Sequence, residues 1–286
     1  MKFATTLLNI AQDDLKSSII LYEKGLYPQA LFYFQQAVEK SNKAFALFNE
    51  IITPEELQNK IGHNTLNIYN IILKAQQQLI IDISAATNIN PQLRNVQTIN
   101  NVLSPETKRV IDKGLESLYN IKTNKKYIVN MTDRDIINII QYLTPQSFTR
   151  LKPTNKIVNT IKTSIACSKK ENIELLLAIG SEEAKREATI ISETSLNTIS
   201  DKRYKSIAKA FCKTMNKVPY LCHSLLVLYF TSIITLPHSI NTRYPDIKKS
   251  TNPKLLYTKS YPLIKYLPYF YVLLKKTFRC LPEYAQ

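Results

Sequence analysis

Residues 22–44 read YEKGLYPQALFYFQQAVEKSNKA, and this stretch decides the fold. Before it, apolar residues recur at steps of three and four from about residue 5 to 24, which predicts a helix that ends at Gly25. Pro28 suits the first turn of a second helix over 28–49, whose buried side would carry Phe34. Because the turn between the two helices is so short, we expect them to pair antiparallel.

The composition supports an all-helical fold. The chain has only four glycines in 286 residues, whereas average usage would give roughly twenty. Hairpins and bulges rely on glycine for positive φ, so a β-sandwich or barrel is disfavoured. No two glycines are close enough to form a phosphate-binding loop of the GxGxxG or GxxxxGK type.

The cysteines at 167, 212, 222 and 280 contain no CxxC pair, which argues against a structural zinc site. We expect buried thiols in a reducing compartment, no metal and no cofactor. The start of the chain has no small-residue cleavage site before Asp13 and Asp14, so we interpret it as a first helix and the protein as cytoplasmic.

Further helices follow the opening pair. The pattern predicts a loop with a short helix over 87–104, a helical acidic start to 180–203, and a kinked final helix over 255–281. The other expected helices cover 64–84, a segment that starts at Ser104, and 132–143, 155–167 and 169–179. We see no internal repeat.

Residues 218–236 read VPYLCHSLLVLYFTSIITL and carry no charge. By length alone this is a candidate membrane span. Its Ser and Thr residues and the soluble composition of the rest of the chain favour a helix buried in protein instead. Membrane association stays open as the alternative.

Charge is distributed unevenly along the chain. Residues 1–100 hold eight basic and eight acidic side chains, residues 101–200 hold fifteen and eleven, and residues 201–286 hold fifteen and three. The net charge therefore rises from 0 to +4 to +12. A basic excess at one end suits a phosphate-rich partner or an anionic membrane. The alternative is a solvated, lysine-rich surface.

Three segments resemble the HEPN family. Residues 22–44 are similar to the HEPN signature, in which Tyr-x-x-Gly-x-Tyr leads into a helix of the form A-x-F-x-x-Q-Q-A-x-E-K-x-x-K-A. Gly62-His63 is similar to the Gly-His that often precedes the third helix, and residues 237–246 are similar to the Arg-Tyr-Pro-Asp segment of stand-alone members. The resemblance implies one all-α antiparallel helical bundle over 1–286, with a helical insertion at about 87–200.

The resemblance implies RNA or nucleotide binding, in toxin–antitoxin systems or in stress and antiphage defence. It also implies a homodimer and a nucleotidyltransferase partner. Catalytic members carry R-x(4–6)-H, in which histidine is the general acid or base and arginine stabilises the phosphate. None of His63, His223 and His238 has an arginine within seven residues upstream, so we expect binding without the usual ribonuclease motif.

The candidate site residues come from two places. Gln36, Lys40 and Lys43 lie with Glu39 on one flank of the second helix, which either lines a cleft or is a solvated face with Glu39–Lys43 pairing. With Arg243 and Tyr244 they form the predicted RNA- or nucleotide-binding set.

The catalytic candidates are His238 and Arg243, because a histidine near an arginine can bind or cleave a phosphodiester. The alternative is that Arg243 clamps a helix end and His238 caps one. His63 and His223 are interpreted as structural.

Two other functions remain open. Residues 25–37 are also similar to one helix pair of a tetratricopeptide repeat, which would make the chain a protein–protein scaffold, although that architecture needs several copies at a 34-residue period. A divergent, metal-independent endoribonuclease that uses His238 and Arg243 is the other.

Overall fold

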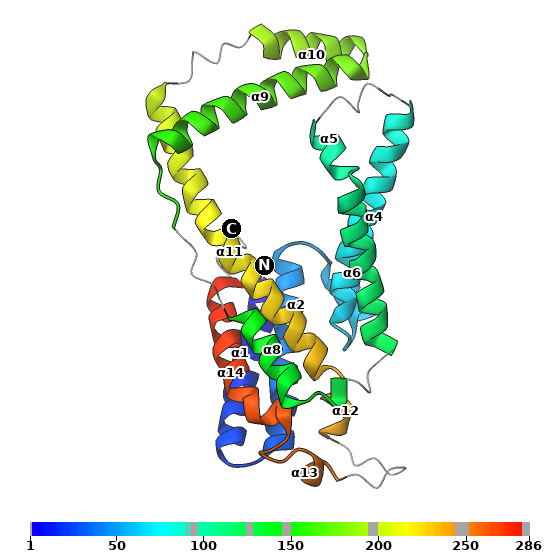
Figure 1. Cartoon of the computed structure of the whole chain (residues 1–286), viewed down its shortest axis with the longest axis vertical. Helices are drawn as coiled ribbons and strands as arrows, with labels where there is room; N and C mark the ends of the chain where they lie inside the picture. Colours follow the sequence, from blue (N-terminus) through cyan, green and yellow to red (C-terminus); the bar gives the residue numbers. More distant parts are fainter. Residues whose placement is uncertain are drawn as a thin grey trace. The chain divides into compact units, whose positions relative to one another are not determined.

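The computed structural model describes residues 2–89, 91, 97–123, 128–144, 150–193, 200–243 and 252–281. Within this part the chain is helical and contains no strand, which confirms the all-α prediction (Figure 1). The helices are α1 (Lys2–Glu23), α2 (Tyr27–Phe48), α3 (Pro54–Glu56), a π-helical turn (Leu57–Ile61), α4 (Leu66–Ile89), α5 (Gln97–Val102), α6 (Pro105–Thr123), α8 (Asp133–Leu143), α9 (Asn155–Ile179), α10 (Glu182–Glu193), α11 (Asp201–Thr235), α12 (His238–Asn241), α13 (Pro253–Leu256) and α14 (Pro262–Cys280).

The chain divides into two compact units. The first unit comprises Met1–Ile72, Leu115–Ser147 and Pro219–Gln286, and the second unit comprises Leu73–Gly114 and Phe148–Val218. The predicted insertion at about 87–200 shares many residues with the second unit but does not coincide with it. That residues 87–200 are an insertion into a HEPN-like bundle stays a prediction.

The turn between α1 and α2 forms as the sequence predicts. Gly25 adopts a left-handed φ of 74°. The amide of Gly25 donates to the carbonyl of Tyr22 at 3.0 Å, and that of Leu26 donates to the carbonyl of Leu21 at 2.9 Å. This pair of bonds is a Schellman motif, which satisfies the last carbonyls of α1 and reverses the chain.

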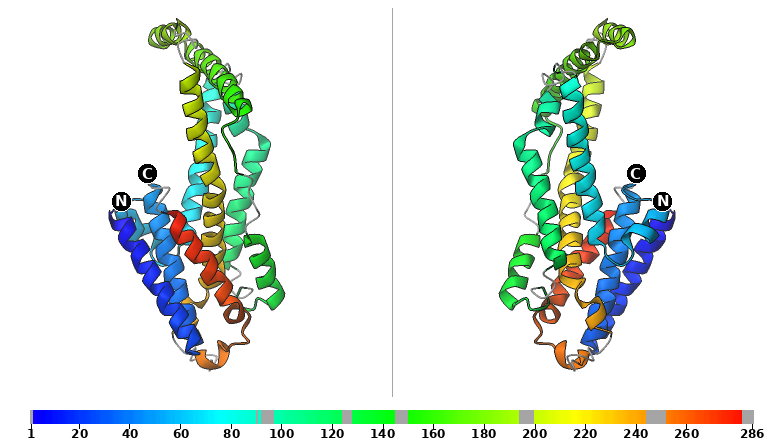
Figure 2. Two further views of the ribbon diagram at one scale, coloured as in Figure 1. Left: turned by 90° about the vertical axis from the view of Figure 1, so that its left-hand side faces the viewer. Right: turned by 90° about the vertical axis from the view of Figure 1, so that its right-hand side faces the viewer.

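The core of the first unit lies between α1, α2 and α14. Phe34 of α2 is fully buried and meets the rings of Phe270 and Tyr271 at centroid distances of 6.4 and 5.6 Å. The buried hydroxyl of Ser18 donates to the carbonyl of Ala30 at 2.6 Å and lies 2.9 Å from the Tyr271 hydroxyl. The carboxyl-terminal helix α14 is therefore packed alongside the opening helix pair (Figure 2).

The second half of α11 also enters this core. Val227 and Leu228 are fully buried, and the Asn42 side-chain amide donates to the Ser232 hydroxyl at 2.9 Å. Among the described residues, α11 is the one helix long and apolar enough to cross a membrane, with a mean hydropathy of 1.5 over its most apolar stretch and 47% of that stretch buried. The buried polar contact with Asn42 favours the predicted core helix, and membrane association stays the untested alternative.

In the second unit, α9 packs against α10 and against the first half of α11. Val158 and Ile161 of α9 form a small apolar cluster with Tyr204 and Ala208 of α11. The prediction of two helices over 155–167 and 169–179 is wrong, because no proline or glycine interrupts α9 before its left-handed cap at Gly180.

Two further expectations were also wrong. Residues 255–281 do not form one kinked helix. Pro262 starts α14 after an extended Tyr261, separately from α13, while Pro268 lies inside α14. Cys167 and Cys222 are exposed, so burial of all four thiols does not hold, although Cys212 is buried.

Candidate functional site

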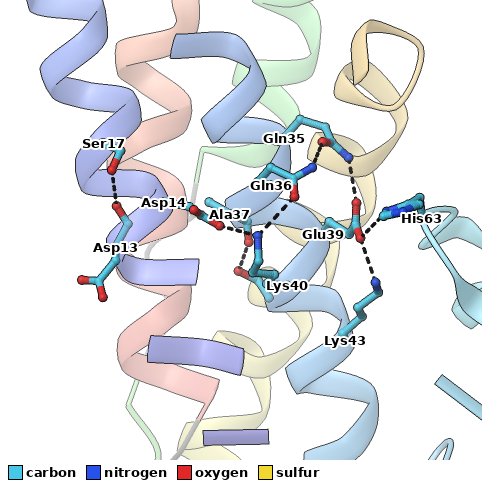
Figure 3. Close-up of polar contacts among 11 residues, drawn as sticks. Asp13, Asp14, Ser17, Gln35, Gln36, Ala37, Glu39, Lys40, Lys43 and His63 are labelled. Carbon is cyan, nitrogen blue, oxygen red and sulfur yellow. Dashed lines mark hydrogen bonds and ion pairs between the residues drawn. The ribbon is translucent and has the colours of Figure 1, made fainter. Parts of the chain in front are cut away.

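The polar face of α2 is organised around the carboxylate of Glu39, whose side chain is only 5% exposed. Its Oε1 accepts from Lys43 Nζ at 2.7 Å and from His63 Nδ1 at 3.1 Å, and its Oε2 accepts from Gln35 Nε2 at 3.2 Å (Figure 3). A buried carboxylate is costly unless it is paired and hydrogen-bonded, and here both of its oxygens have donors.

The hydrogen bonds continue from Gln35 along α2 to α1. Gln36 Nε2 donates to Gln35 Oε1 at 2.7 Å. Lys40 Nζ donates to Gln36 Oε1 at 3.2 Å and to Asp14 Oδ2 of α1 at 2.6 Å. Together with the bonds of Glu39, these contacts form one connected network, which we name the polar chain: Asp14, Lys40, Gln36, Gln35, Glu39, Lys43 and His63.

The charges of the polar chain neutralise each other. Lys40 pairs with Asp14, and Lys43 pairs with Glu39. The Glu39–Lys43 pairing that was one of the two interpretations of this flank is therefore present. Neither lysine is an unpaired cation, so the polar chain orients side chains more than it supplies net positive charge.

His63 is the exposed end of the polar chain. It follows the π-helical turn and Gly62, whose φ of 53° and ψ of −125° lie in a region that L-residues avoid. A Cβ on Gly62 would meet no atom within 4 Å, so the backbone angle rather than space requires glycine there. This turn aims the imidazole at Glu39, while 92% of the His63 side chain stays exposed.

The carboxylate fixes the tautomer of His63. An ionised carboxylate can only accept hydrogen bonds, so the proton shared with Glu39 belongs to Nδ1 of His63. The other ring nitrogen, Nε2, then serves as an acceptor in the neutral ring and as a second donor in the protonated ring.

Arg243 lies on the same side of α2 as His63. Its side chain is exposed, its Nε donates to the carbonyl of Ser239 in α12 at 3.1 Å, and its guanidinium carbon is 5.1 Å from the centroid of the Phe32 ring. The bond to Ser239 matches the interpretation of Arg243 as a clamp on a helix end. Tyr244, the other predicted binding residue of this segment, lies outside the described residues.

His238 is an interior residue. It is 1% exposed, its Nδ1 lies 2.8 Å from the Tyr257 hydroxyl, and its ring meets Tyr261 edge-on. Burial lowers the pKa of His238 to about 4, so the ring is neutral at pH 7. The structure therefore does not bring His238 and the exposed Arg243 together at one surface.

The other two histidines differ from each other in how far they are exposed to solvent. His223 is half-buried with Nε2 2.7 Å from the carbonyl of Leu143, as expected for a satisfied structural histidine. His63, which the sequence analysis treated as structural, is the exposed one. Sequence reasoning missed its contact with Glu39 because that contact spans 24 residues, and the Gly62-His63 pair was the only local signal.

These observations first define a class: a small helical domain built on an antiparallel helix pair and closed by a Gly-His turn. Residues 4–66 match the family model of the HEPN domain, and a HEPN domain suggests a function related to nucleotides or RNA in general. The matched range holds the whole polar chain and residues 25–37, on which the tetratricopeptide alternative rested. No curated protein and no solved structure matches the chain.

Proposed function

We propose that the chain is a HEPN-type RNA- or nucleotide-binding protein that lacks the R-x(4–6)-H ribonuclease motif and acts in stress or antiphage defence. The HEPN match over residues 4–66 supports the ligand class. The missing motif supports binding over cleavage. A homodimer and a nucleotidyltransferase partner belong to the same proposal, by family analogy.

The observation that carries the proposal is the buried carboxylate of Glu39, which holds an exposed imidazole in one orientation. A ring fixed through Nδ1 can present Nε2 to a phosphate oxygen, and the contact loses little side-chain entropy because the ring is already oriented. Lys43 shares the same carboxylate oxygen and acts as a positioning residue for this arrangement.

Arg243 supplies a second phosphate donor on this face. Phe32, under the guanidinium, and Glu39, under the imidazole, are seven residues apart on α2. Seven residues are two helical turns, or about 10 Å along the axis. A guanidinium group and an oriented imidazole ring at this separation suit two phosphates of a short RNA segment, or the phosphate and base of a nucleotide.

Binding is favoured over cleavage because acid–base catalysis of RNA cleavage uses a positioned base and a positioned acid. Among the described histidines, His63 alone is exposed, and the buried His238 has a depressed pKa and a tyrosine partner. The face of α2 thus offers one oriented imidazole, which is enough for binding.

The test is titration of the full chain with a fluorescently labelled oligouridylate and, separately, with a fluorescent GTP analogue. His63→Ala and Arg243→Ala should each weaken binding of at least one of these probes about tenfold, because each removes a charge-assisted hydrogen bond worth about 1.5 kcal/mol. Lys60→Ala, in the same π-helical turn, and Arg279→Ala, on α14, are the matched exposed controls and should bind normally.

Two results would overturn the proposal. The first is a double variant of His63 and Arg243 that binds both probes as tightly as the unmodified protein. The second is RNA cleavage by the unmodified protein that stops in His63→Ala, since the site would then be a ribonuclease centre.

A further inference from the structure

Two segments of the second unit carry a strong excess of positive charge. Residues 150–170 and 201–217 together hold twelve basic side chains and one acidic side chain, Asp201. That aspartate is already paired, because its Oδ1 accepts from Lys162 Nζ of α9 at 2.7 Å. The positive charge of these two segments is therefore not neutralised by acidic residues of the same segments.

Four of these lysines form a line along α11. Lys202, Lys205, Lys209 and Lys213 follow one another at steps of three and four residues and are all exposed, and we name them the lysine stripe. A step of four residues advances about 6 Å along a helix. This interval is comparable with the spacing of successive phosphates on a nucleic-acid strand.

A neighbouring flank of the same helical segment is buried. Tyr204, Ala208 and Cys212 are all less than 7% exposed, and Tyr204 and Ala208 pack on Val158 and Ile161 of α9. This flank of α11 is thus occupied within the second unit. The lysine stripe faces solvent, and the apolar Phe211 and Met215 of the same segment are also exposed.

An additional pair of cations is fixed beside this segment. The side chain of Asn216 accepts from the amide of Leu151 at 2.7 Å and donates to the carbonyl of Leu151 at 3.0 Å. These two hydrogen bonds hold the backbone of Leu151 against α11, about one turn beyond Lys213. The exposed Arg150 and Lys152 flank Leu151 and are therefore kept near this segment. The basic surface therefore draws on two separate stretches of the chain.

Repulsion between neighbouring lysines of this surface lowers the stability of the folded protein. Like charges at i and i+4 destabilise a helix by about 0.2–0.5 kcal/mol per pair, and Lys205, Lys209 and Lys213 form two such pairs. A bound polyanion removes this repulsion and gains free energy by releasing its counterions.

We propose that the lysine stripe, with Arg150 and Lys152, binds the phosphate backbone of single-stranded RNA without regard to base sequence. The inference goes beyond the proposed site on α2, because these residues belong to the second unit, and it rests on the proposed function only for the choice of RNA. A lipid surface is the less favoured partner. A helix that lies on a membrane inserts its apolar side, and here Tyr204 and Ala208 of that side are buried against α9.

The test compares two triple variants of the full chain with equal change in charge. In the stripe variant, Lys205, Lys209 and Lys213 become Gln. In the control variant, the exposed Lys259, Lys275 and Lys276 of the first unit become Gln. Both should keep the helical circular dichroism signal, since all six side chains are exposed.

The readout is the affinity for a labelled oligouridylate as a function of salt concentration. The slope of log affinity against log salt should flatten by about 2 in the stripe variant, since each lost phosphate contact on a single strand contributes about 0.7. The control variant should keep its slope. Equal slopes in both variants, or no RNA binding by the unmodified protein, would overturn the inference.

Flotation with phosphatidylserine-containing vesicles separates the lipid alternative. The unmodified protein should bind RNA in preference to vesicles, and vesicle binding that the stripe variant loses while RNA binding persists would contradict the proposal. The two proposals fail independently, because His63→Ala leaves the stripe intact and the stripe variant leaves the polar chain intact.

Discussion

The two units handle charge in opposite ways. In the first unit, Lys40 and Lys43 are paired with Asp14 and Glu39 inside the polar chain. In the second unit, the lysines of the stripe stand in a row, and residues 150–170 and 201–217 hold a single acidic residue, Asp201, which is already paired. The difference indicates that the paired charges orient side chains, whereas the unopposed charges are suited to binding a partner.

The largest effect should come from the core on which the polar chain is built. Phe34→Ala should destabilise the protein by about 3–5 kcal/mol, because it empties a fully buried site between α2 and α14. Chemical denaturation followed by circular dichroism measures this loss. Tyr33→Ala, at the adjacent, partly exposed position, should change stability by less than about 1 kcal/mol. Equal losses would contradict the assignment of the core.

The next effect concerns pH. His238 has a folded pKa of about 4 against 6.5 for the free side chain, so the unfolded chain takes up a proton first as pH falls. The stability associated with the neutral ring is present above pH 6.5 and is lost between pH 6.5 and 4, by about 3 kcal/mol in total. His238→Gln should remove this part of the pH dependence of unfolding. A curve for His238→Gln parallel to that of the unmodified protein would show that His238 is not buried as described.

Glu39→Gln should cost about 1–2 kcal/mol. Removing one partner of a fully buried ion pair costs about 3–5 kcal/mol, but Lys43 and His63 both reach solvent and can be hydrated. Glu23→Gln, on the exposed end of α1, is the control and should be nearly neutral. If both substitutions prove neutral in urea titrations, Glu39 does not organise the polar chain.

A stability effect of similar size should come from the turn that aims His63. Gly62→Ala should cost about 1–2 kcal/mol through its positive φ alone, since the added Cβ would meet no neighbour. It should also weaken binding of the RNA or nucleotide probe, because the imidazole would lose its orientation. Unchanged stability and unchanged binding in Gly62→Ala would separate the turn from the site.

The sequence predicted the helix pair and its turn well, because these depend on local signals. Gly25 and Pro28 mark the end of one helix and the start of the next, and the apolar spacing sets the buried side of each. The sequence predicted less well whether a long helix continues without a break. Nothing in the sequence breaks α9 near residue 168, and the helix continues through the position where a break was expected.

The site was harder to predict because it depends on tertiary contacts. His63 is exposed and His238 is buried, and no local pattern encodes this difference. The burial of His238 involves Tyr257, which follows α13 later in the chain. The lysine stripe lies in a segment whose charge was evident from the sequence. Its exposure depends on the tertiary packing of α9 against the neighbouring flank of α11, which no local pattern encodes.

One comparison tests the contrast between the two units most directly. Lys40 and Lys43 are changed to Gln together in one protein, and Lys205 and Lys209 in another, so both lose two charges. Stability and the salt dependence of RNA affinity are measured for each. The first variant should lose stability and keep its salt slope, and the second should keep stability and flatten its slope by about 1.4. The reverse pattern, or the same change in both proteins, would contradict the account.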